Sequence, residues 1–221
     1  MNIKRIHLNC KSIHNSGFWI ATIICIAAIS IFILVAPVFV VEKKDILDMM
    51  TFQYLDQYVS DTNTHIALFV TFFGTGTFLI PLYTIIIFKL TRSGNQNEAL
   101  IVFEISTSSL ILGEALKEIF KRPRPMLHHL DGAGGFSFPS GHTLGAFTLC
   151  GILLYLTYKS KFYNNIKLLL YFGFFLISVM IGLSRIYLHV HYASDIIGSF
   201  FAALIWFMLY FIYSIISKPD T

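Results

Sequence analysis

Charged residues are scarce in this sequence: Asp, Glu, Lys and Arg together make up 13% of the 221 residues, whereas hydrophobic residues make up 56%. The mean hydropathy is +0.70. Soluble domains carry about 25% charged residues, so the composition excludes an ordinary soluble domain and indicates an integral membrane protein. The net charge of +4 comes from scattered residues. Without a clustered basic face, we expect no nucleic-acid partner.

Cysteine is also scarce, and the three cysteines, Cys10, Cys25 and Cys150, lie far apart in the chain. An odd number of widely spaced cysteines, two of them inside apolar runs, predicts neither a disulfide framework nor a metal site. No acidic cluster that could hold two divalent metal ions accompanies the polar motifs described below. We therefore expect a protein that works without a metal ion and without any other cofactor.

Long hydrophobic runs, in contrast, are abundant. Hydropathy divides the chain into six apolar stretches, at residues 18–41, 66–88, 99–116, 143–158, 166–183 and 196–216. A membrane-spanning helix needs about 20 such residues, so six spans use more than half of the chain and leave no room for a soluble domain. The sequence predicts an all-α fold, an integral membrane bundle of six transmembrane helices that forms a single domain over residues 1–221.

The distribution of lysine and arginine predicts the orientation of this bundle. With a cytoplasmic N-terminus, the inside segments hold nine of these residues and the opposite side holds seven. This mild bias favours cytoplasmic positions for both termini. The first apolar stretch is too long for the core of a signal peptide and is interpreted as a retained anchor. We expect an integral protein of the bacterial cytoplasmic (inner) membrane.

Three short polar strings interrupt the apolar pattern in the second half of the chain. They are Lys117 followed by Arg124-Pro125, then Pro139-Ser140-Gly141-His142, and then Ser184-Arg185 followed by His191 and Asp195. The first string ends the third predicted helix, the second begins the fourth, and the last joins the fifth and sixth. Six spans therefore place all the strings on one membrane face, which the charge bias makes the extracytoplasmic face.

The second string immediately precedes an apolar run, so Ser140 is a natural N-cap for a helix. The amides at the start of a helix bind anions, and Gly141 leaves room for a phosphate oxygen to approach the backbone. His142 follows directly and could give a proton to a departing oxygen. The same four residues are also compatible with a simple turn that caps a helix and binds no phosphate.

In the third string, His191 and Asp195 are four residues apart, so on a helical backbone they share one face. The carboxylate could then bind one ring nitrogen and leave the other free to attack phosphorus. Alone, this pair would also be compatible with an ordinary hydrogen bond at the end of a helix.

Cations complete the pattern. Lys117, Arg124 and Arg185 can stabilise the charge of a phosphoryl group in the transition state, with arginine as a bidentate fork and lysine as a point charge. For Lys121 and Arg122 we expect a different role, that of snorkelling anchors at the membrane surface.

Taken together, the three strings resemble the signature of the type 2 phosphatidic acid phosphatase family of membrane lipid phosphatases. The resemblance covers residues 117–195, about a third of the chain. It implies that the phosphate is held by Lys117, Arg124, Ser140, Gly141 and Arg185. It also implies that His142 is the general acid, His191 the nucleophile and Asp195 the partner of His191. Ala193 departs from the pattern, because relatives often have proline between the histidine and the aspartate.

From the motifs and the resemblance we expect a membrane lipid phosphatase that hydrolyses a lipid phosphate monoester or diphosphate through a phosphohistidine intermediate. Its expected partners are the lipid phosphate substrate and the bilayer, with no obligate protein partner. The foremost substrate candidates are undecaprenyl diphosphate and phosphatidylglycerophosphate. A lipid A phosphate group, phosphatidic acid and diacylglycerol pyrophosphate are alternatives that the sequence does not separate.

Two other functions fit parts of the pattern. Vanadium-dependent haloperoxidases resemble this family in their anion site, but they are soluble, so the apolar spans disfavour this function. A phospholipid-binding or lipid-moving membrane protein would use the cations without a nucleophile. The intact set of His142, His191 and Asp195 argues against it.

Some residues stay open at this stage. The segment from Glu42 to Thr64 contains apolar residues near helical spacing, which fits an amphipathic helix on the membrane surface or a solvated loop. His189 is interpreted as a neighbour of the site or an interfacial residue. Glu114 could pair with Lys117, and for Glu104 we favour a buried interhelical hydrogen bond over a catalytic role.

Overall fold

The structure of the chain is a computed structural model that describes residues 16–36, 46–126 and 134–216. These residues form eight α-helices and no strand. The helices are α1 (Ser16–Ala36), α2 (Ile46–Asp56), α3 (Asp61–Phe72), α4 (Gly76–Arg92), α5 (Gln96–Phe120), α6 (Gly141–Lys159), α7 (Asn164–Tyr187) and α8 (Ala193–Ile216). The predicted all-α fold is confirmed.

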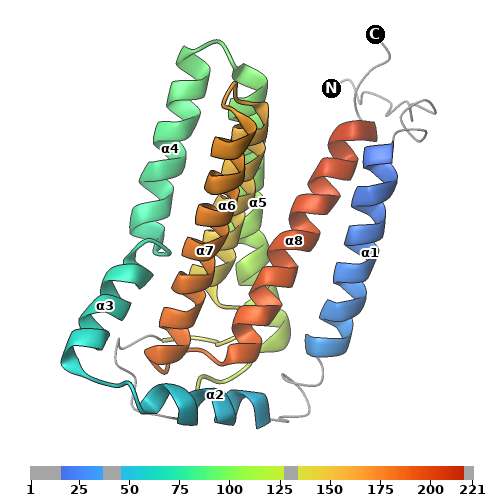
Figure 1. Cartoon of the computed structure of the whole chain (residues 1–221). Coiled ribbons are helices and arrows are strands. Elements are labelled where there is room, and N and C mark those ends of the chain that lie inside the picture. The colour runs from blue at the N-terminus through green and yellow to red at the C-terminus, as the bar shows by residue number, and fades with distance from the viewer. Residues whose placement is uncertain (1–15, 37–45, 127–133, 217–221) are drawn as a thin grey trace.

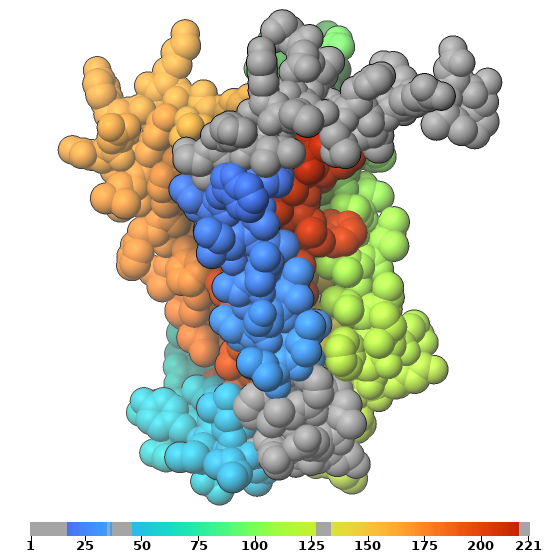
Figure 2. All heavy atoms as spheres, turned by 90° about the vertical axis from the view of Figure 1, so that its right-hand side faces the viewer, coloured from blue at the N-terminus to red at the C-terminus, as the bar shows by residue number. Residues whose placement is uncertain are grey.

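The long helices run side by side, and α2 lies across one end of the bundle (Figure 1). α6 packs against α5, α7 and α8, while α4 packs on α5 and α3 packs on α7. α1 packs along α8 on the outside of the bundle, where Figure 2 shows it in front of the other helices. The first residues of α1 and the last residues of α8 lie at the end opposite α2 (Figure 1).

Five helical segments in the described part of the chain are long and apolar enough to cross a membrane. They are Gly17–Leu34, Asp61–Arg92, Gln96–Phe120, Asn164–Tyr187 and Ala193–Ile216. α6, which contains the predicted fourth span, is not among them. It buries Thr143, Thr148 and Thr157 against its neighbours, and the Thr148 hydroxyl lies 2.6 Å from that of Ser109 in α5. These three threonines thus face protein. The count of six spans and the location of both termini stay predictions.

The predicted second span, at residues 66–88, is divided into α3 and α4. Gly74 lies in the break, where a β-carbon would be only 2.8 Å from Ile181 of α7 and 3.0 Å from the β-carbon of His142 in α6. The absence of a side chain at Gly74 lets these helices approach closely. Thr75 then caps α4, since its hydroxyl accepts a hydrogen bond from the amide of Phe78.

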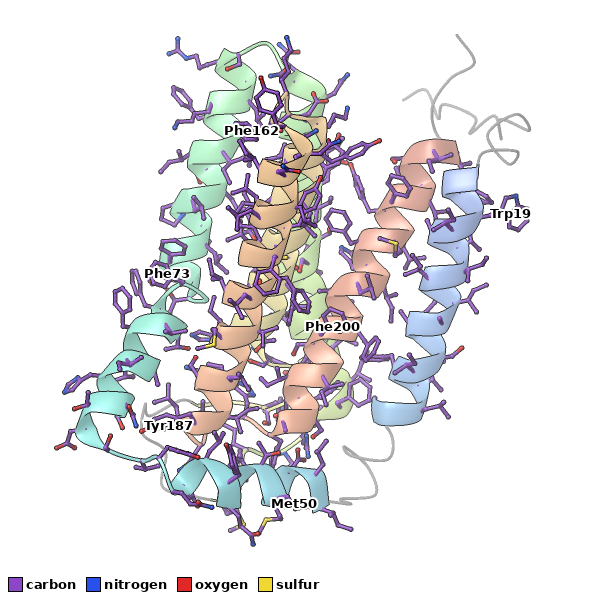
Figure 3. The ribbon with its side chains drawn as sticks, viewed as in Figure 1. Trp19, Met50, Phe73, Phe162, Tyr187 and Phe200 are labelled. Carbon is purple, nitrogen blue, oxygen red and sulfur yellow. The ribbon has the colours of Figure 1, made fainter. Side chains whose placement is uncertain are left out.

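The segment between α1 and α3 contains a helix, although its residues 42–45 lie outside the described part of the chain. α2 turns Asp48 and Phe52 toward the bundle and buries both. Its other side exposes Met49 and Met50, and Figure 3 shows the side chain of Met50 pointing away from the bundle. In an ordinary amphipathic helix the buried face is apolar, but the buried face of α2 carries the carboxylate of Asp48 beside the ring of Phe52.

The end of the bundle that α2 covers also contains the last turns of α5 and α7 and the first turns of α6 and α8 (Figure 1). These are the helix ends to which the three polar strings belong. The strings therefore lie at one end of the fold.

Candidate active site

The centre of this end is the imidazole of His191, which lies in the turn between α7 and α8. Its Nδ1 atom is 3.4 Å from Oδ2 of Asp195, in the first turn of α8. The side chain of His191 is 2% exposed and that of Asp195 is fully buried. The predicted pairing of these two residues is thus present, in a site shielded from water.

Arg124 lies on the other side of the same imidazole. Its Nη1 atom donates to the carbonyl of Val190 at 2.6 Å and lies 3.2 Å from Nε2 of His191. Its other nitrogens donate to the carbonyls of Gly134 and Gly135. The backbone therefore fixes this guanidinium beside the ring nitrogen that does not face Asp195.

The second string forms the N-terminus of α6 as predicted. The hydroxyl of Ser140 accepts hydrogen bonds from the amide of Thr143 at 3.5 Å and from its hydroxyl at 3.0 Å. The amide of Ser140 donates to Ser199 of α8, whose hydroxyl in turn donates to the carbonyl of Asp195 at 2.7 Å. Ser199 thereby ties the start of α6 to the segment that carries Asp195.

Lys117 reaches this helix end from the last turn of α5. Its Nζ atom lies 3.6 Å from the place that a β-carbon on Gly141 would occupy, and 2.8 Å from Oε1 of Glu114. The predicted pair between Lys117 and Glu114 is confirmed. The ammonium group therefore lies where a helix N-terminus already attracts anions.

Arg185 and His142 approach from α7 and α6. Arg185 is buried, and its Nη1 atom donates to the hydroxyl of Thr71 in α3 at 3.0 Å. His142 is the second residue of α6 and is half-buried, with its β-carbon against Gly74. Arg185, like Arg124, is close enough to disfavour positive charge on His191. All the predicted site residues thus lie at this end of the bundle.

One expectation about this region is wrong. Arg122 is not a snorkelling anchor, because its side chain is 4% exposed and lies against Asp195, with Nη1 2.5 Å from Oδ1. Its neighbour Lys121, at 63% exposure, fits the expectation. Lys121 ends α5 in the left-handed conformation, with φ at 45°, and this turn directs the next side chain inward.

Two further residues of this region, Asp48 and Ser137, are not predicted from the sequence. Asp48 of α2 accepts a hydrogen bond from Nη2 of Arg122 at 2.9 Å. Ser137 donates a short hydrogen bond from its hydroxyl to Oδ2 of Asp195. A signal for Asp48 was present in hindsight, since it is an isolated acid among apolar residues on a short helix.

Burial and charge set the protonation of the site. Burial lowers the pKa of His191 below its usual range, and Arg124 and Arg185 act in the same direction, although Asp195 opposes them. The ring is therefore neutral at neutral pH, and a neutral imidazole has a lone pair available on one nitrogen. Burial also disfavours the charge of Arg122, but Asp195 and Asp48 outweigh it and hold the pKa of Arg122 above its usual value.

Two residues left open by the sequence have partners outside this centre. Nε2 of His189 is 2.7 Å from Oδ1 of Asp56 in α2, and the backbone of His189 has a positive φ of 59°. Glu104 of α5 accepts a hydrogen bond from the hydroxyl of Tyr210 in α8 at 2.6 Å. His189 is thus a neighbour of the site. Glu104 makes an interhelical hydrogen bond as expected, but its side chain is exposed and not buried.

The chain is similar to known proteins along most of its length. A model of the PAP2 superfamily matches residues 98–218. The chain is 32% identical over 141 residues to phosphatidylglycerophosphatase B of Bacillus subtilis (strain 168), covering 63% of this chain and 70% of that protein. It is 27% identical over 162 residues to the undecaprenyl-diphosphatase BcrC of the same strain, covering 70% of this chain and 76% of that protein.

A solved structure is similar to the fold described above. It is the crystal structure of a transmembrane PAP2 type phosphatidylglycerolphosphate phosphatase from Bacillus subtilis, with a TM-score of 0.80 and 25% sequence identity. The similarity covers 89% of this chain and 98% of that one. The arrangement of helices is therefore shared over most of both proteins.

Proposed function

Since the chain belongs to the PAP2 superfamily and is a membrane lipid phosphatase, we propose that it removes phosphate from a lipid phosphate monoester or diphosphate with His191 as the nucleophile. The observation that carries this proposal is the position of the imidazole. Its Nδ1 atom faces the carboxylate of Asp195, and its Nε2 atom faces the guanidinium of Arg124. A neutral ring held in this way presents one nitrogen to a bound phosphate.

In the proposed reaction, Nε2 of His191 attacks phosphorus and the bond between phosphorus and the leaving oxygen breaks. His142, at the start of α6, gives the leaving oxygen its proton. Asp195 stabilises the positive charge that forms on the ring. Water then attacks the phosphohistidine, with His142 taking its proton, and free phosphate and neutral His191 result.

The proposed phosphate site consists of cations and helix amides. Lys117, Arg124 and Arg185 balance the charge that shifts among the phosphate oxygens in the transition state. Ser140 and Gly141 bring the positive end of the α6 dipole to the same place. With this set of charges the reaction needs no divalent metal ion.

The proposed substrates are undecaprenyl diphosphate and phosphatidylglycerophosphate. Support comes from the relatives, one of which is named an undecaprenyl-diphosphatase and the other a phosphatidylglycerophosphatase. A lipid A phosphate group, phosphatidic acid and diacylglycerol pyrophosphate are the alternatives. Phosphate release from a panel of these lipids by the purified protein, in the presence of a chelator, ranks them directly and also tests the independence from metal ions.

The proposed role of His191 has a matched control in the same turn. His189→Ala removes a second imidazole two residues away, whose Nε2 atom faces Asp56 of α2. We expect His191→Ala to lose phosphate release and His189→Ala to retain it. The opposite result would overturn the assignment of the nucleophile.

We also propose that the site faces the extracytoplasmic side of the cytoplasmic membrane. The lysine and arginine bias supports this orientation. Met50 lies at the end of the bundle that carries the site and is exposed, whereas Lys161 follows α6 at the other end. A membrane-impermeant thiol reagent should label Met50→Cys in intact cells and leave Lys161→Cys unlabelled; the reverse labelling would invert the orientation.

A further inference from the structure

The carboxylate behind the nucleophile is held by more groups than its histidine. Oδ2 of Asp195 accepts hydrogen bonds from the hydroxyl of Ser137 and, at 2.9 Å, from the amide of Tyr192, and it also faces Nδ1 of His191. Oδ1 faces Nη1 of Arg122 at 2.5 Å. The guanidinium therefore fixes the rotation of the carboxylate, so that Oδ2 is the oxygen that points at the imidazole.

Arg122 is itself fixed from three sides. Its Nη1 atom also donates to the hydroxyl of Ser194 at 2.8 Å, and its Nη2 atom donates to Oδ2 of Asp48 at 2.9 Å. The guanidinium carbon lies 3.9 Å from the centre of the Tyr192 ring, a distance typical of a cation–π contact. A planar side chain with several nitrogens can make all these contacts at once, which a lysine could not do.

Asp48 connects this cluster to α2. Its side chain is fully buried, its Oδ1 atom accepts a hydrogen bond from the amide of Ser194 at 2.9 Å, and its Oδ2 atom accepts one from the hydroxyl of the same residue at 2.7 Å. Ser194 directly precedes Asp195 at the start of α8. One carboxylate of α2 thus holds both the arginine and the backbone next to Asp195.

The charges of the cluster suit a histidine nucleophile. Two carboxylates, those of Asp48 and Asp195, face a single guanidinium, which leaves one net negative charge behind His191. When the ring becomes positive during phosphoryl transfer, this negative charge stabilises it. A fully compensated cluster would offer less stabilisation.

We propose that Arg122 and Asp48 are positioning residues that act through Asp195. Through them, the orientation of the His191 ring depends on the position of α2 against the bundle. The inference rests on the proposed function, in which His191 attacks the phosphate. Neither residue belongs to the three strings that bind and attack the phosphate. Their effect should therefore appear in kcat and not in KM.

The test uses the purified full-length protein and whichever lipid of the panel, phosphatidylglycerophosphate included, the wild type hydrolyses fastest. Arg122→Lys keeps the charge but loses the fork, and groups that orient a reacting side chain typically contribute about 10- to 100-fold, so we expect a fall of that size in kcat. For Asp48→Asn, which weakens one contact of the arginine, we expect a fall of about threefold to tenfold. In both variants KM should stay within about twofold of the wild type.

The double variant tests whether the two residues act through a shared group. Because Arg122 and Asp48 both act through Asp195, Asp48→Asn combined with Arg122→Lys should lose less kcat than the product of the two single losses. Losses that multiply would show that the residues act independently and would overturn the proposal. A rise in KM at unchanged kcat would also overturn it, because it would place Arg122 against the substrate.

Matched controls separate positioning from general damage. Lys121→Met removes the neighbouring cation, whose exposed side chain pairs with Glu118, and Asp56→Asn removes another carboxylate of α2. Both should retain the kcat of the wild type. Thermal unfolding of each variant in detergent measures its stability. If Arg122→Lys cannot be purified in folded form, the kcat of Asp48→Asn tests the proposal by itself. Wild-type kcat in Asp48→Asn would then overturn the proposal.

The same experiment distinguishes this inference from the proposed function. If His191→Ala releases phosphate like the wild type, the proposed function fails and the inference fails with it. If His191→Ala is inactive while Arg122→Lys and Asp48→Asn are as active as the wild type, only the inference fails.

Discussion

The two sides of the His191 ring differ in charge. The region on the Nε2 side, which we call the phosphate side, contains Arg124, and Lys117 and Arg185 lie at the same end of the bundle, in the last turns of α5 and α7. The region on the Nδ1 side, the support side, contains Asp195 and Asp48, which share one arginine. The positive charge of the phosphate side attracts a phosphate group. The negative charge of the support side stabilises the imidazole when it becomes positive. The imidazole lies at the boundary between them.

On the support side, the largest loss of kcat is expected from Asp195→Asn, which keeps the shape of the side chain and removes its charge. The amide would favour the wrong tautomer of His191, and in a well-studied triad the corresponding change lowers kcat by about 10⁴-fold, so we expect a loss of about 10³- to 10⁴-fold here. Phosphate release measures it, with Asp56→Asn as the control. A loss below tenfold would contradict the support role.

On the phosphate side, Arg124→Lys keeps the positive charge but loses the fork that the carbonyls of Val190 and Gly134 hold. Removal of one oriented donor from a transition-state site costs about 10²- to 10³-fold, so kcat/KM should fall by about that factor. Kinetics with the preferred lipid measure the change. Equal kcat/KM in the variant and the wild type would remove Arg124 from the phosphate site.

Ser137→Ala removes a single hydrogen bond to Asp195 and leaves Arg122 in place. A hydrogen bond to a charged group contributes about 1.5–3 kcal/mol. Asp195 keeps three other contacts, so we expect a loss of about tenfold in kcat. The comparison with Asp195→Asn then shows how the support is divided. A loss as large as that of Asp195→Asn would mean that Ser137 has a chemical role of its own.

The smallest effect is expected in the pH dependence. Because burial lowers the pKa of His191 below its usual value of 6.5, the ring is neutral above that pH, and kcat/KM should fall only at lower pH as the ring becomes protonated. Arg124→Met removes a nearby positive charge, which favours protonation of His191. The fall of kcat/KM at low pH should therefore begin at a higher pH in this variant. A shift of this fall to lower pH would contradict the electrostatic account.

The sequence predicts the two sides unequally, for a physical reason. The phosphate side consists of residues in short strings with fixed spacing, and Ser140 caps α6 as its position before an apolar run indicates. On the support side the spacing of four residues predicts Asp195, but the rest depends on contacts between distant residues, since Arg122 and Asp48 are 74 positions apart. No local pattern specifies that contact, and only the left-handed turn at Lys121 directs Arg122 inward.

The fold shows the same distinction. Hydropathy predicts the positions of the long helices, because lipid-facing residues are apolar regardless of their partners. It does not predict the break between α3 and α4, which arises where Gly74 packs against α6 and α7. It also does not predict that α6 buries its threonines against protein.

The central claim is that the phosphate passes through His191. The most direct measurement is a rapid-quench experiment with a lipid labelled in its phosphate group, stopped in alkali, in which phosphohistidine survives, and followed by mapping of the labelled peptide. We predict that the label appears first on His191 in the wild type and in His189→Ala, and that His191→Ala binds none and releases no phosphate. Label on another residue, or wild-type phosphate release by His191→Ala, would contradict the account.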